Sequence, residues 1–547
     1  MKTNAWLGAV AAGCVAAVAL PWSRSVAAAT QEHLGTVSFP VSCAPGVQAS
    51  FDRGVALLHD FWYEEARPQF ERILTADPGC SMAHWGIAMS VFHQIWDRPG
   101  VATMAFGWHA MEAAETHPAR TARERAYIAA LADFYRPGPA DYQVRIDAYS
   151  AAMGKLYAAH PQDVDAGAFY ALSLLAAETP SDTSLNQERK AMAVLAPLWT
   201  RYPDHPGLIH YIIHSCDNPP LAPEGLAAAR AYGTVASSGP HAAHMPGHIF
   251  ARLGLWQEDI EANVNSVEAS RVAQLHHESG WMDQFHSDDF LVYAYLQSGE
   301  EGKARATVAA SNAAISHYES MPGMSAGNPD DYMEGMFPYY RVKLPIFVDL
   351  ETRDWARTLE VEPIHGAPPD TQDIVYWAHA IAAGHLHRAV DAHHARESYD
   401  ALIGEVLKGR HAYAAQGVGQ RITRGEILAW TAFADGQVEE ALKHMRASAD
   451  LQDRVGQGEV DIPAREMLAD MLLEVRRPKE ALTEYRRSLE LSPNRFNGLY
   501  GAGRAAEAAG ETTSARRYFA ALLKATDDGA HSSRPEIGYA KAFVANP

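Results

Sequence analysis

The chain is poor in cysteine and in basic residues, and both shortages limit what it can be. It has four cysteines in 547 residues, and 46 Lys and Arg against 66 Asp and Glu give a formal net charge of −20 at pH 7. Because such an acidic protein repels phosphate backbones and anionic membrane surfaces, we expect no nucleic-acid partner. With 48% hydrophobic and 20% charged residues, the composition is typical of a globular protein.

The sequence also lacks the short motifs that identify common enzyme classes. It has no HExxH zinc motif, no GxxxxGK[ST] phosphate-binding loop and no CxxC pair. A GxSxG match runs from Gly323 to Gly327, but Pro322 precedes it and Asn328 follows it. A serine hydrolase needs a strand before this motif and a helix after it, so we interpret the match as chance.

No apolar run is long enough to span a bilayer, but residues 1–29 are typical of a secretory signal peptide. Lys2 supplies a positive start, residues 6–20 are apolar, and three alanines at 27–29 offer a cleavage site. Since a transmembrane helix needs about 20 apolar residues, we expect export without membrane insertion. The mature chain is expected in the periplasm or outside the cell. A lipoprotein signal ending at Cys14 is the weaker alternative, because the apolar segment continues beyond it.

Export places the three remaining cysteines in an oxidising compartment, where one pair and one leftover thiol are expected. Cys43 and Cys80 flank the first recognisable helix pair, so a bridge between them would staple the amino end of the fold. That leaves Cys216 as the leftover thiol. The alternative is three buried free thiols.

What the sequence does contain is an internal repeat. Ala481 and Tyr485 are followed 34 residues later by Ala515 and Phe519. Small residues recur where two helices touch, and aromatic residues recur where space must be filled. The pattern resembles the tetratricopeptide repeat (TPR), in which each unit of 34 residues is an antiparallel helix pair. The resemblance extends over residues 47–527 and implies an all-α, right-handed solenoid of degenerate 34-residue helical hairpins.

The period breaks in the middle of the chain, and strand signals are nearly absent throughout. Residues 321–345 are rich in Pro, Gly and Asp, which are typical of loops. We therefore expect four segments: a signal peptide at 1–29, an amino-terminal TPR-like array at 30–320, a linker or insertion at 321–345, and a carboxyl-terminal TPR-like array at 346–547.

Histidine is enriched, with 26 residues, and its placement follows the repeat. His210 and His214 lie 34 residues before His244 and His248, so two HxxxH pairs occupy equivalent places in consecutive units. Imidazoles at positions i and i+4 share one helix face and can bind one cation. Two such pairs in repeat register are a more specific signal than a single pair, which helices produce by chance.

Counting back from the expected turn glycines extends this pattern to a neighbouring unit. Relative to Gly254 and Gly299, the histidine offsets form an i, i+3, i+7 stripe on the first helix of each pair. The TPR resemblance implies that this stripe lines the concave groove. The expected metal ligands are His210, His214, His241, His244, His248, His286 and Asp289. Asp217 and Tyr293 are expected to orient the imidazoles or to accept protons, with Asp217 also an alternative ligand.

Neutral imidazoles with one carboxylate suit a transition metal such as zinc, copper or iron. Two other interpretations stay open: a groove whose histidines hydrogen-bond a peptide without metal, and histidines that are structural or incidental. Pro246 complicates the stripe, because a proline inside a helix kinks or ends it. If a helix begins near Met245, His241 and His244 would lie on the entering loop.

The TPR resemblance favours a binding protein over an enzyme. Our leading hypothesis is an exported TPR solenoid that binds a peptide or protein partner in its concave groove and carries a His-rich transition-metal site. The alternatives are a metal-dependent hydrolase or oxidoreductase on the same scaffold, and a metal-free peptide-binding scaffold. The segment from Val41 to Trp96, together with HMPGHIF at 244–250, also resembles a group of exported bacterial repeat proteins.

Overall fold

The protein is described from a computed structural model covering residues 32–546, apart from 97, 118, 180, 181, 183, 278, 322–331, 365, 409–416, 457 and 459. The expected signal peptide and the GxSxG match lie outside the described residues. In the described part of the chain, every regular element is a helix. The prediction of an all-α fold is confirmed.

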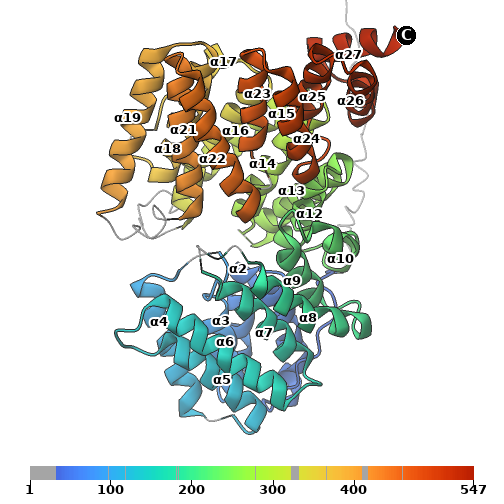
Figure 1. Cartoon of the computed structure of the whole chain (residues 1–547). Helices are drawn as coiled ribbons and strands as arrows, with labels where there is room; N and C mark the ends of the chain where they lie inside the picture. Colours follow the sequence, from blue (N-terminus) through green and yellow to red (C-terminus); the bar gives the residue numbers. More distant parts are fainter. Residues whose placement is uncertain are drawn as a thin grey trace, which may run out of the picture. The chain divides into compact units, whose positions relative to one another are not determined.

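The helices follow one another with short connections along the whole described chain (Figure 1). The first eight are α1 (Gln48–His59), α2 (Tyr63–Ala76), α3 (Ser81–Met89), α4 (Val101–Thr116), α5 (Ala122–Tyr135), α6 (Tyr142–Ala159), α7 (Val164–Ala176) and α8 (Asn186–Arg201). The next eight are α9 (Pro206–Cys216), α10 (Ala222–Val235), α11 (Pro240–His244), α12 (Pro246–Arg252), α13 (Trp256–His277), α14 (Trp281–Gln297), α15 (Glu301–Glu319) and α16 (Tyr332–Glu351). The last are α17 (Trp355–Thr358), α18 (Pro369–His385), α19 (Ala389–Val406), α21 (Val418–Ala434), α22 (Val438–Val455), α23 (Ala464–Glu474), α24 (Pro478–Leu491), α25 (Phe496–Ala508), α26 (Thr512–Ala525) and α27 (Pro535–Ala545). Two short 3₁₀ helices span Pro45–Val47 and Asp527–Gly529.

Helices adjacent in sequence make most of the packing contacts, as expected for a TPR-like solenoid of helical hairpins. Small residues lie where helices touch, both within a hairpin and between neighbouring hairpins. A Cβ atom added to Gly501 would lie 2.3 Å from the ring of Tyr485, and one added to Gly503 would lie 2.5 Å from Phe519. The 34-residue pattern of small and aromatic residues is therefore a packing pattern.

Two of the expected turn glycines adopt a backbone conformation that favours glycine. Gly254 connects α12 to α13 with φ +62°, and Gly299 connects α14 to α15 with φ +70°. At Gly254 a Cβ would also lie 2.2 Å from the carbonyl oxygen of Pro493. Next to this contact, the indole nitrogen of Trp256 donates a hydrogen bond of 2.8 Å to the carbonyl oxygen of Asn494. The turn at Gly254, in the expected amino-terminal array, therefore contacts residues of the expected carboxyl-terminal array.

Helix α16 occupies much of the range expected as a linker or insertion. It begins at Tyr332 and contains both Pro338 and Pro345. Phe337 and Leu344 are buried, so apolar packing keeps this proline-containing segment helical. Residues 322–331 of that range lie outside the described residues, and the division into two arrays stays a prediction.

The expected bridge between Cys43 and Cys80 is confirmed. The two residues are disulfide-bonded with their Cα atoms 5.0 Å apart, and the bond ties the segment before α1 to the start of α3. Cys216 is a buried free thiol at the end of α9.

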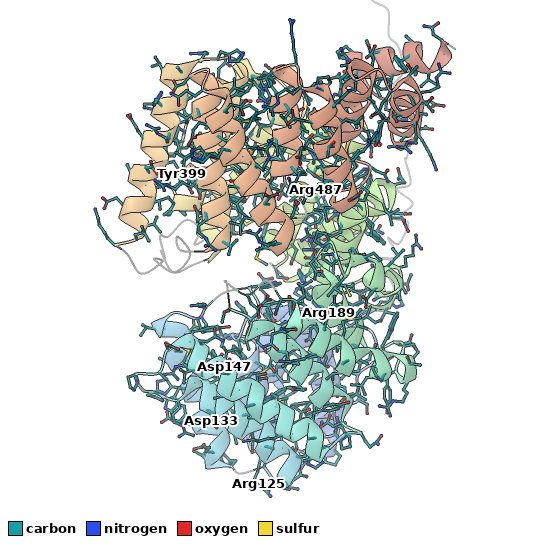
Figure 2. The ribbon with its side chains drawn as sticks, in the orientation of Figure 1. Arg125, Asp133, Asp147, Arg189, Tyr399 and Arg487 are labelled. Atoms are coloured by element: carbon teal, nitrogen blue, oxygen red, sulfur yellow. A yellow bond between two sulfur atoms is a disulfide. The ribbon has the colours of Figure 1, made fainter. Side chains whose placement is uncertain are left out.

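The outer faces of the helices carry charged side chains. Figure 2 shows Arg125 and Asp133 on α5 and Asp147 on α6 extending outward, and all three are exposed. None of the helices in the described ranges is both long enough and apolar enough to cross a membrane.

Candidate metal centre

Six of the predicted histidines lie on four helices between residues 206 and 297. His210 and His214 lie on α9, His241 and His244 on α11, His248 on α12, and His286 on α14. The residue between α11 and α12, Met245, has helical dihedral angles (φ −52°, ψ −34°). Pro246 therefore removes a donor without breaking the path of the chain, and His244 stays one helical turn from His248. A helix does begin at Pro246, but His241 and His244 lie on a short helix of their own and not on a loop.

The first imidazole cluster consists of His210, His214 and His241. One ring nitrogen from each lies within 4.8 Å of the others, close enough to bind one ion. The Nε2 atoms of His210 and His214 are 3.0 Å apart, and the ring of His241 lies 5.1 Å from that of His210. Both members of one HxxxH pair and a histidine from the next unit thus converge, as the repeat register predicts.

The second imidazole cluster consists of His244, His248 and His286. Its ring nitrogens also lie within 4.8 Å of one another. The Nε2 atoms of His244 and His248 are 2.9 Å apart, and the ring centroids of His244 and His286 are 4.4 Å apart. The two clusters have the same composition: an HxxxH pair and one histidine from a following helix.

The two clusters are neighbours. The ring centroids of His241 and His244 are 6.2 Å apart, and those of His214 and His248 are 6.5 Å apart. The six imidazoles therefore form one continuous group. This spacing brings two ions bound in the clusters close to each other.

The histidines are more deeply buried than a groove wall would be. His210 is 0% exposed and His244 is 1% exposed. The ring of Phe61, in the turn between α1 and α2, contacts His210, His214 and His241, and Phe290 covers the second cluster. The expectation of an open stripe facing a concave groove is corrected here. The aromatic turn of the first hairpin packs onto the histidine face, where four of the six imidazoles are buried and those of His214 and His286 are partly exposed.

The second cluster has its ring tautomers set by hydrogen bonds at Nδ1. His248 Nδ1 lies 2.8 Å from a carboxylate oxygen of Asp217, whose other oxygen accepts a hydrogen bond from Arg252. His244 Nδ1 lies 2.6 Å from the amide oxygen of Asn263, and the amide nitrogen of Asn263 donates to Asp259. Because both partners of the imidazoles are acceptors, both Nδ1 atoms carry the proton.

This assignment puts two lone pairs opposite each other. A neutral imidazole protonated at Nδ1 has an unprotonated Nε2, and the two Nε2 atoms of the HxxxH pair lie 2.9 Å apart. An extra proton or a cation between them would satisfy both atoms. In the first cluster, His210 Nδ1 donates to the carbonyl oxygen of His59 at 2.5 Å, which also leaves its Nε2 as an acceptor.

The surroundings disfavour the extra proton. Burial and then the neighbouring imidazoles lower the pKa of His210 and His244 well below the ordinary value, and burial lowers the pKa of His241 to about 3. Burial also raises the pKa of Asp259 well above its usual range and that of Asp283 to about 7. Neutral imidazoles next to buried carboxyl groups form a site that a metal cation would stabilise.

Of the other predicted site residues, Asp217 lies where an orienting group should, but Asp289 and Tyr293 do not join the clusters. Asp289 accepts a hydrogen bond from Lys343 in a buried ion pair. Tyr293 donates to the carbonyl oxygen of Asp461 and is hydrogen-bonded by Arg495. Both residues have the expected offset on α14, but Asp289 faces α16 and Tyr293 faces the segments that precede α23 and α25.

Several residues at the site have no signal in the sequence. A third buried group brings His59, Asp165 and His205 together, with Asp165 Oδ1 3.0 Å from His59 Nε2 and 3.3 Å from His205 Nε2. Asn263, which orients His244, likewise has no signal in the sequence. These residues are separated by distances along the chain that bear no relation to the 34-residue period, so the period could not have found them.

Comparisons with known proteins add little to this geometry. No protein-family model matches the chain, and no curated protein matches it significantly in sequence. Among solved structures, a human IFIT1 dimer with m7Gppp-AAAA has 9% sequence identity and a TM-score of 0.37, with 81% of this chain and 90% of that chain covered. A monomeric IFIT1 mutant with Gppp-AAAA covers the same shares at 9% identity and a TM-score of 0.36. Values this low carry no inference about what this chain binds.

Proposed function

We propose that this protein is an exported TPR solenoid that binds two transition-metal ions, one in each imidazole cluster, and acts as a binding protein. The observation that carries the proposal is the HxxxH pair of His244 and His248. Their Nε2 atoms face each other at 2.9 Å while both Nδ1 protons are donated to Asn263 and Asp217. Hydrogen bonds of this kind orient imidazole ligands in metal sites.

The ligand set favours copper or zinc over iron. Three imidazoles per ion suit both metals, whereas the iron sites of oxygenases include a carboxylate ligand. The carboxylate expected for that role, Asp289, is held by Lys343. Asp217, Asp259 and Asp283 lie around the clusters without entering them. A bound cation would favour the charged forms of Asp259 and Asp283.

A binding role is favoured over catalysis by the burial of the ligands. The imidazoles contact the rings of Phe61 and Phe290, and four of the six are buried, which limits the access of a substrate to bound ions. TPR-like arrays mostly serve as interaction scaffolds. In this proposal the ions fix the inner helices of the amino-terminal array, and peptide or protein partners bind the exported scaffold.

Metal analysis of tagless protein, purified without chelators and reconstituted with Zn²⁺ or Cu²⁺, tests the proposal. We expect about two equivalents per chain in the wild type and about one in the double variant His244→Ala/His248→Ala. The double variant His210→Ala/His214→Ala should likewise bind about one. The matched control is His109→Ala/His394→Ala, which removes two exposed histidines and should keep both ions. Wild-type protein that binds no stoichiometric metal, or paired variants that bind as much as the control, would overturn it.

A further inference from the structure

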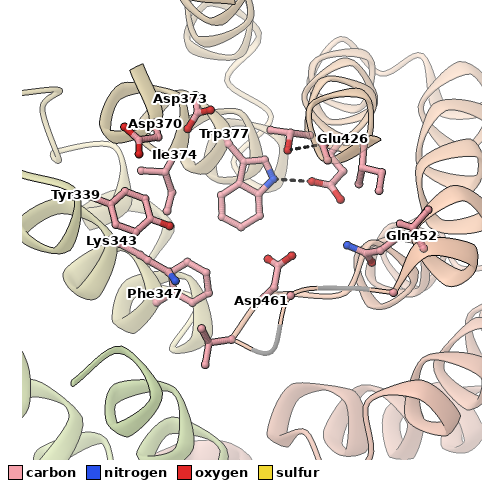
Figure 3. Close-up of a pocket in the computed structure, with 17 residues that line it drawn as sticks. Tyr339, Lys343, Phe347, Asp370, Asp373, Ile374, Trp377, Glu426, Gln452 and Asp461 are labelled. Atoms are coloured by element: carbon pink, nitrogen blue, oxygen red, sulfur yellow. Dashed lines mark hydrogen bonds between the residues drawn. The ribbon is translucent and has the colours of Figure 1, made fainter. Parts of the chain in front are cut away.

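A second candidate site lies in the carboxyl-terminal array, away from the histidines. A cavity of about 480 Å³ is enclosed by α16, α18, α21, α22 and the segment that precedes α23 (Figure 3). Three of its walls are aromatic rings, from Tyr339, Phe347 and Trp377. Phe347 and Trp377 are stacked with their centroids 6.2 Å apart. Cavities of this kind are suited to a small group with an apolar body.

The polar groups of the cavity are mainly carboxylates. Asp373, Glu426 and Asp461 line it, and Figure 3 shows the Asp461 carboxylate pointing into the space below Trp377. Its one cationic side chain among the described residues is Lys343, which forms an ion pair with Asp289. Carboxyl groups therefore outnumber cationic groups in the cavity, and their charged forms favour a cationic ligand.

Two of the polar side chains are nine-tenths buried and still present an atom to the cavity. Glu426 is 4% exposed, and one of its oxygens accepts a hydrogen bond of 2.7 Å from the Trp377 indole nitrogen. Gln452 is 6% exposed, and its amide oxygen accepts from the backbone nitrogen of Ala464. Its amide nitrogen points into the cavity in Figure 3 and has no hydrogen-bond partner among the described residues. An acceptor atom of a ligand in the cavity could bind this donor.

These groups fit an organic cation better than a metal ion. Within the described residues, no three carboxylates of this cavity lie close enough to hold one metal ion. Aromatic faces attract an ammonium group, and carboxylates accept its hydrogen bonds. The free amide donor of Gln452 suits a carbonyl oxygen carried by the same ligand.

We propose that this cavity binds a primary ammonium group on an apolar chain, the chemistry shared by a lysine side chain and an alkylamine. Glu426 and Asp461 bind the ammonium group, and the three aromatic rings contact the apolar chain. Gln452 donates a hydrogen bond to a carbonyl oxygen at the other end of that chain. A lysine within a peptide supplies all three features. This site is independent of the metal centre.

Binding of an ammonium ion should also release protons from the carboxyl groups of the cavity. Burial raises the pKa of Glu426 to about 8 and that of Asp373 to about 7, so both retain protons near neutral pH. A bound ammonium ion favours their charged forms, and so protons are released when it binds. The measured heat of binding at pH 7 then depends on the ionisation enthalpy of the buffer.

Titration calorimetry in two buffers, with N-acetyl-lysine methylamide and n-butylammonium as probes, tests this site. N-acetyl-norleucine methylamide, which lacks the ammonium group, is the matched control ligand. We expect binding of the lysine probe with buffer-dependent heat, and at least about tenfold weaker binding of the norleucine probe. Butylammonium that binds as tightly as the lysine probe identifies free amines as the ligand class, and much weaker binding identifies peptide lysine.

The variants Glu426→Gln and Asp461→Asn should each weaken binding of the lysine probe about tenfold or more. Glu397→Gln, which removes an exposed carboxylate from α19, should leave it unchanged. Metal content and circular dichroism of each variant report folding and keep this test separate from that of the metal centre. Absence of heat with either ammonium probe at 10 mM, equal binding of norleucine, or full binding by the two cavity variants would overturn the proposal.

Discussion

Helices α21 to α26 and helices α9 to α14 use the same close-packing device with different chemistry. In the first region, the rings that lie over glycines are those of Tyr485 and Phe519. In the second, a Cβ on Gly207 would lie 2.3 Å from the His59 imidazole, and one on Gly247 would lie 2.7 Å from the Asn263 amide. In both regions a flat side chain therefore packs against a glycine. The chemistry of that side chain differs between the regions: it is an aromatic ring in the first and an imidazole or an amide in the second.

The two regions also treat buried charge differently. In the carboxyl-terminal array, Arg495 is paired with both Glu351 and Glu466, and all three are almost fully buried. Around the histidines, the buried carboxyl of Asp259 has one oxygen without a hydrogen-bond partner among the described residues. One region carries its own counter-charges, whereas the other is completed by bound cations in our proposal.

The largest effect is expected at the paired charges. Arg495→Ala leaves Glu351 and Glu466 buried without their cation, so we expect a loss of about 3–5 kcal/mol in the free energy of unfolding. Urea unfolding followed by circular dichroism measures it. Arg477→Ala, which removes an exposed ion pair with Glu480, should cost less than about 1 kcal/mol. Similar losses in the two variants would show that the buried network is not a main source of stability.

Metal should stabilise the histidine region alone. At a free metal concentration of 100 times Kd, one bound ion adds about 2.7 kcal/mol to the free energy of unfolding. Hydrogen exchange should therefore slow in α9 to α14 and stay unchanged in α21 to α26 when Zn²⁺ or Cu²⁺ is added. The His244→Ala/His248→Ala variant should lose the slowing around the second cluster. Slowing spread evenly over both regions would contradict the difference between them.

The sequence predicts much of this arrangement because repeat geometry is local. The small and aromatic residues at a 34-residue spacing predict the hairpins, and equal offsets in successive units predict that His210, His214, His244 and His248 lie together. His241 and His286 follow from the same offsets. Each of these predictions depends only on which face of a helix a residue occupies.

Predictions that depend on distant segments fail. Asp289 has the correct offset, but Lys343 from α16 binds it. The histidines are covered by Phe61, which lies about 150 residues before His210 along the chain. The hydrogen bond between His210 and His59 joins equally distant segments. The 34-residue period contains no information about such pairings, because it describes contacts between successive helices only.

A smaller effect is expected where a ring lies over a glycine. Gly501→Ala places a methyl group against the Tyr485 ring, and overpacking of this kind costs about 1–3 kcal/mol. Gly538→Ala in α27 is the matched control, because nothing lies within 4 Å of its added Cβ. Alanine should stabilise that helix by about 0.5–1 kcal/mol. Thermal unfolding of the two variants separates the outcomes, and a neutral Gly501→Ala would show that the aromatic packing adapts.

The smallest effect, counted per pH unit, is a change in the free energy of unfolding caused by Glu426 in the carboxyl-terminal array. Burial raises its pKa from 4.5 to about 8. Between these values the folded chain holds one proton more than the unfolded chain, so its stability falls as pH rises, by up to about 1.4 kcal/mol per unit. The contribution is fully present below about pH 4.5 and is lost once the pH has passed about 8. Glu426→Gln cannot ionise, and urea unfolding between pH 5 and 8 should show a shallower decline for it than for the wild type. Parallel declines would mean that Glu426 is ionised in the folded chain, and the carboxyl-terminal array would then contain a buried carboxylate.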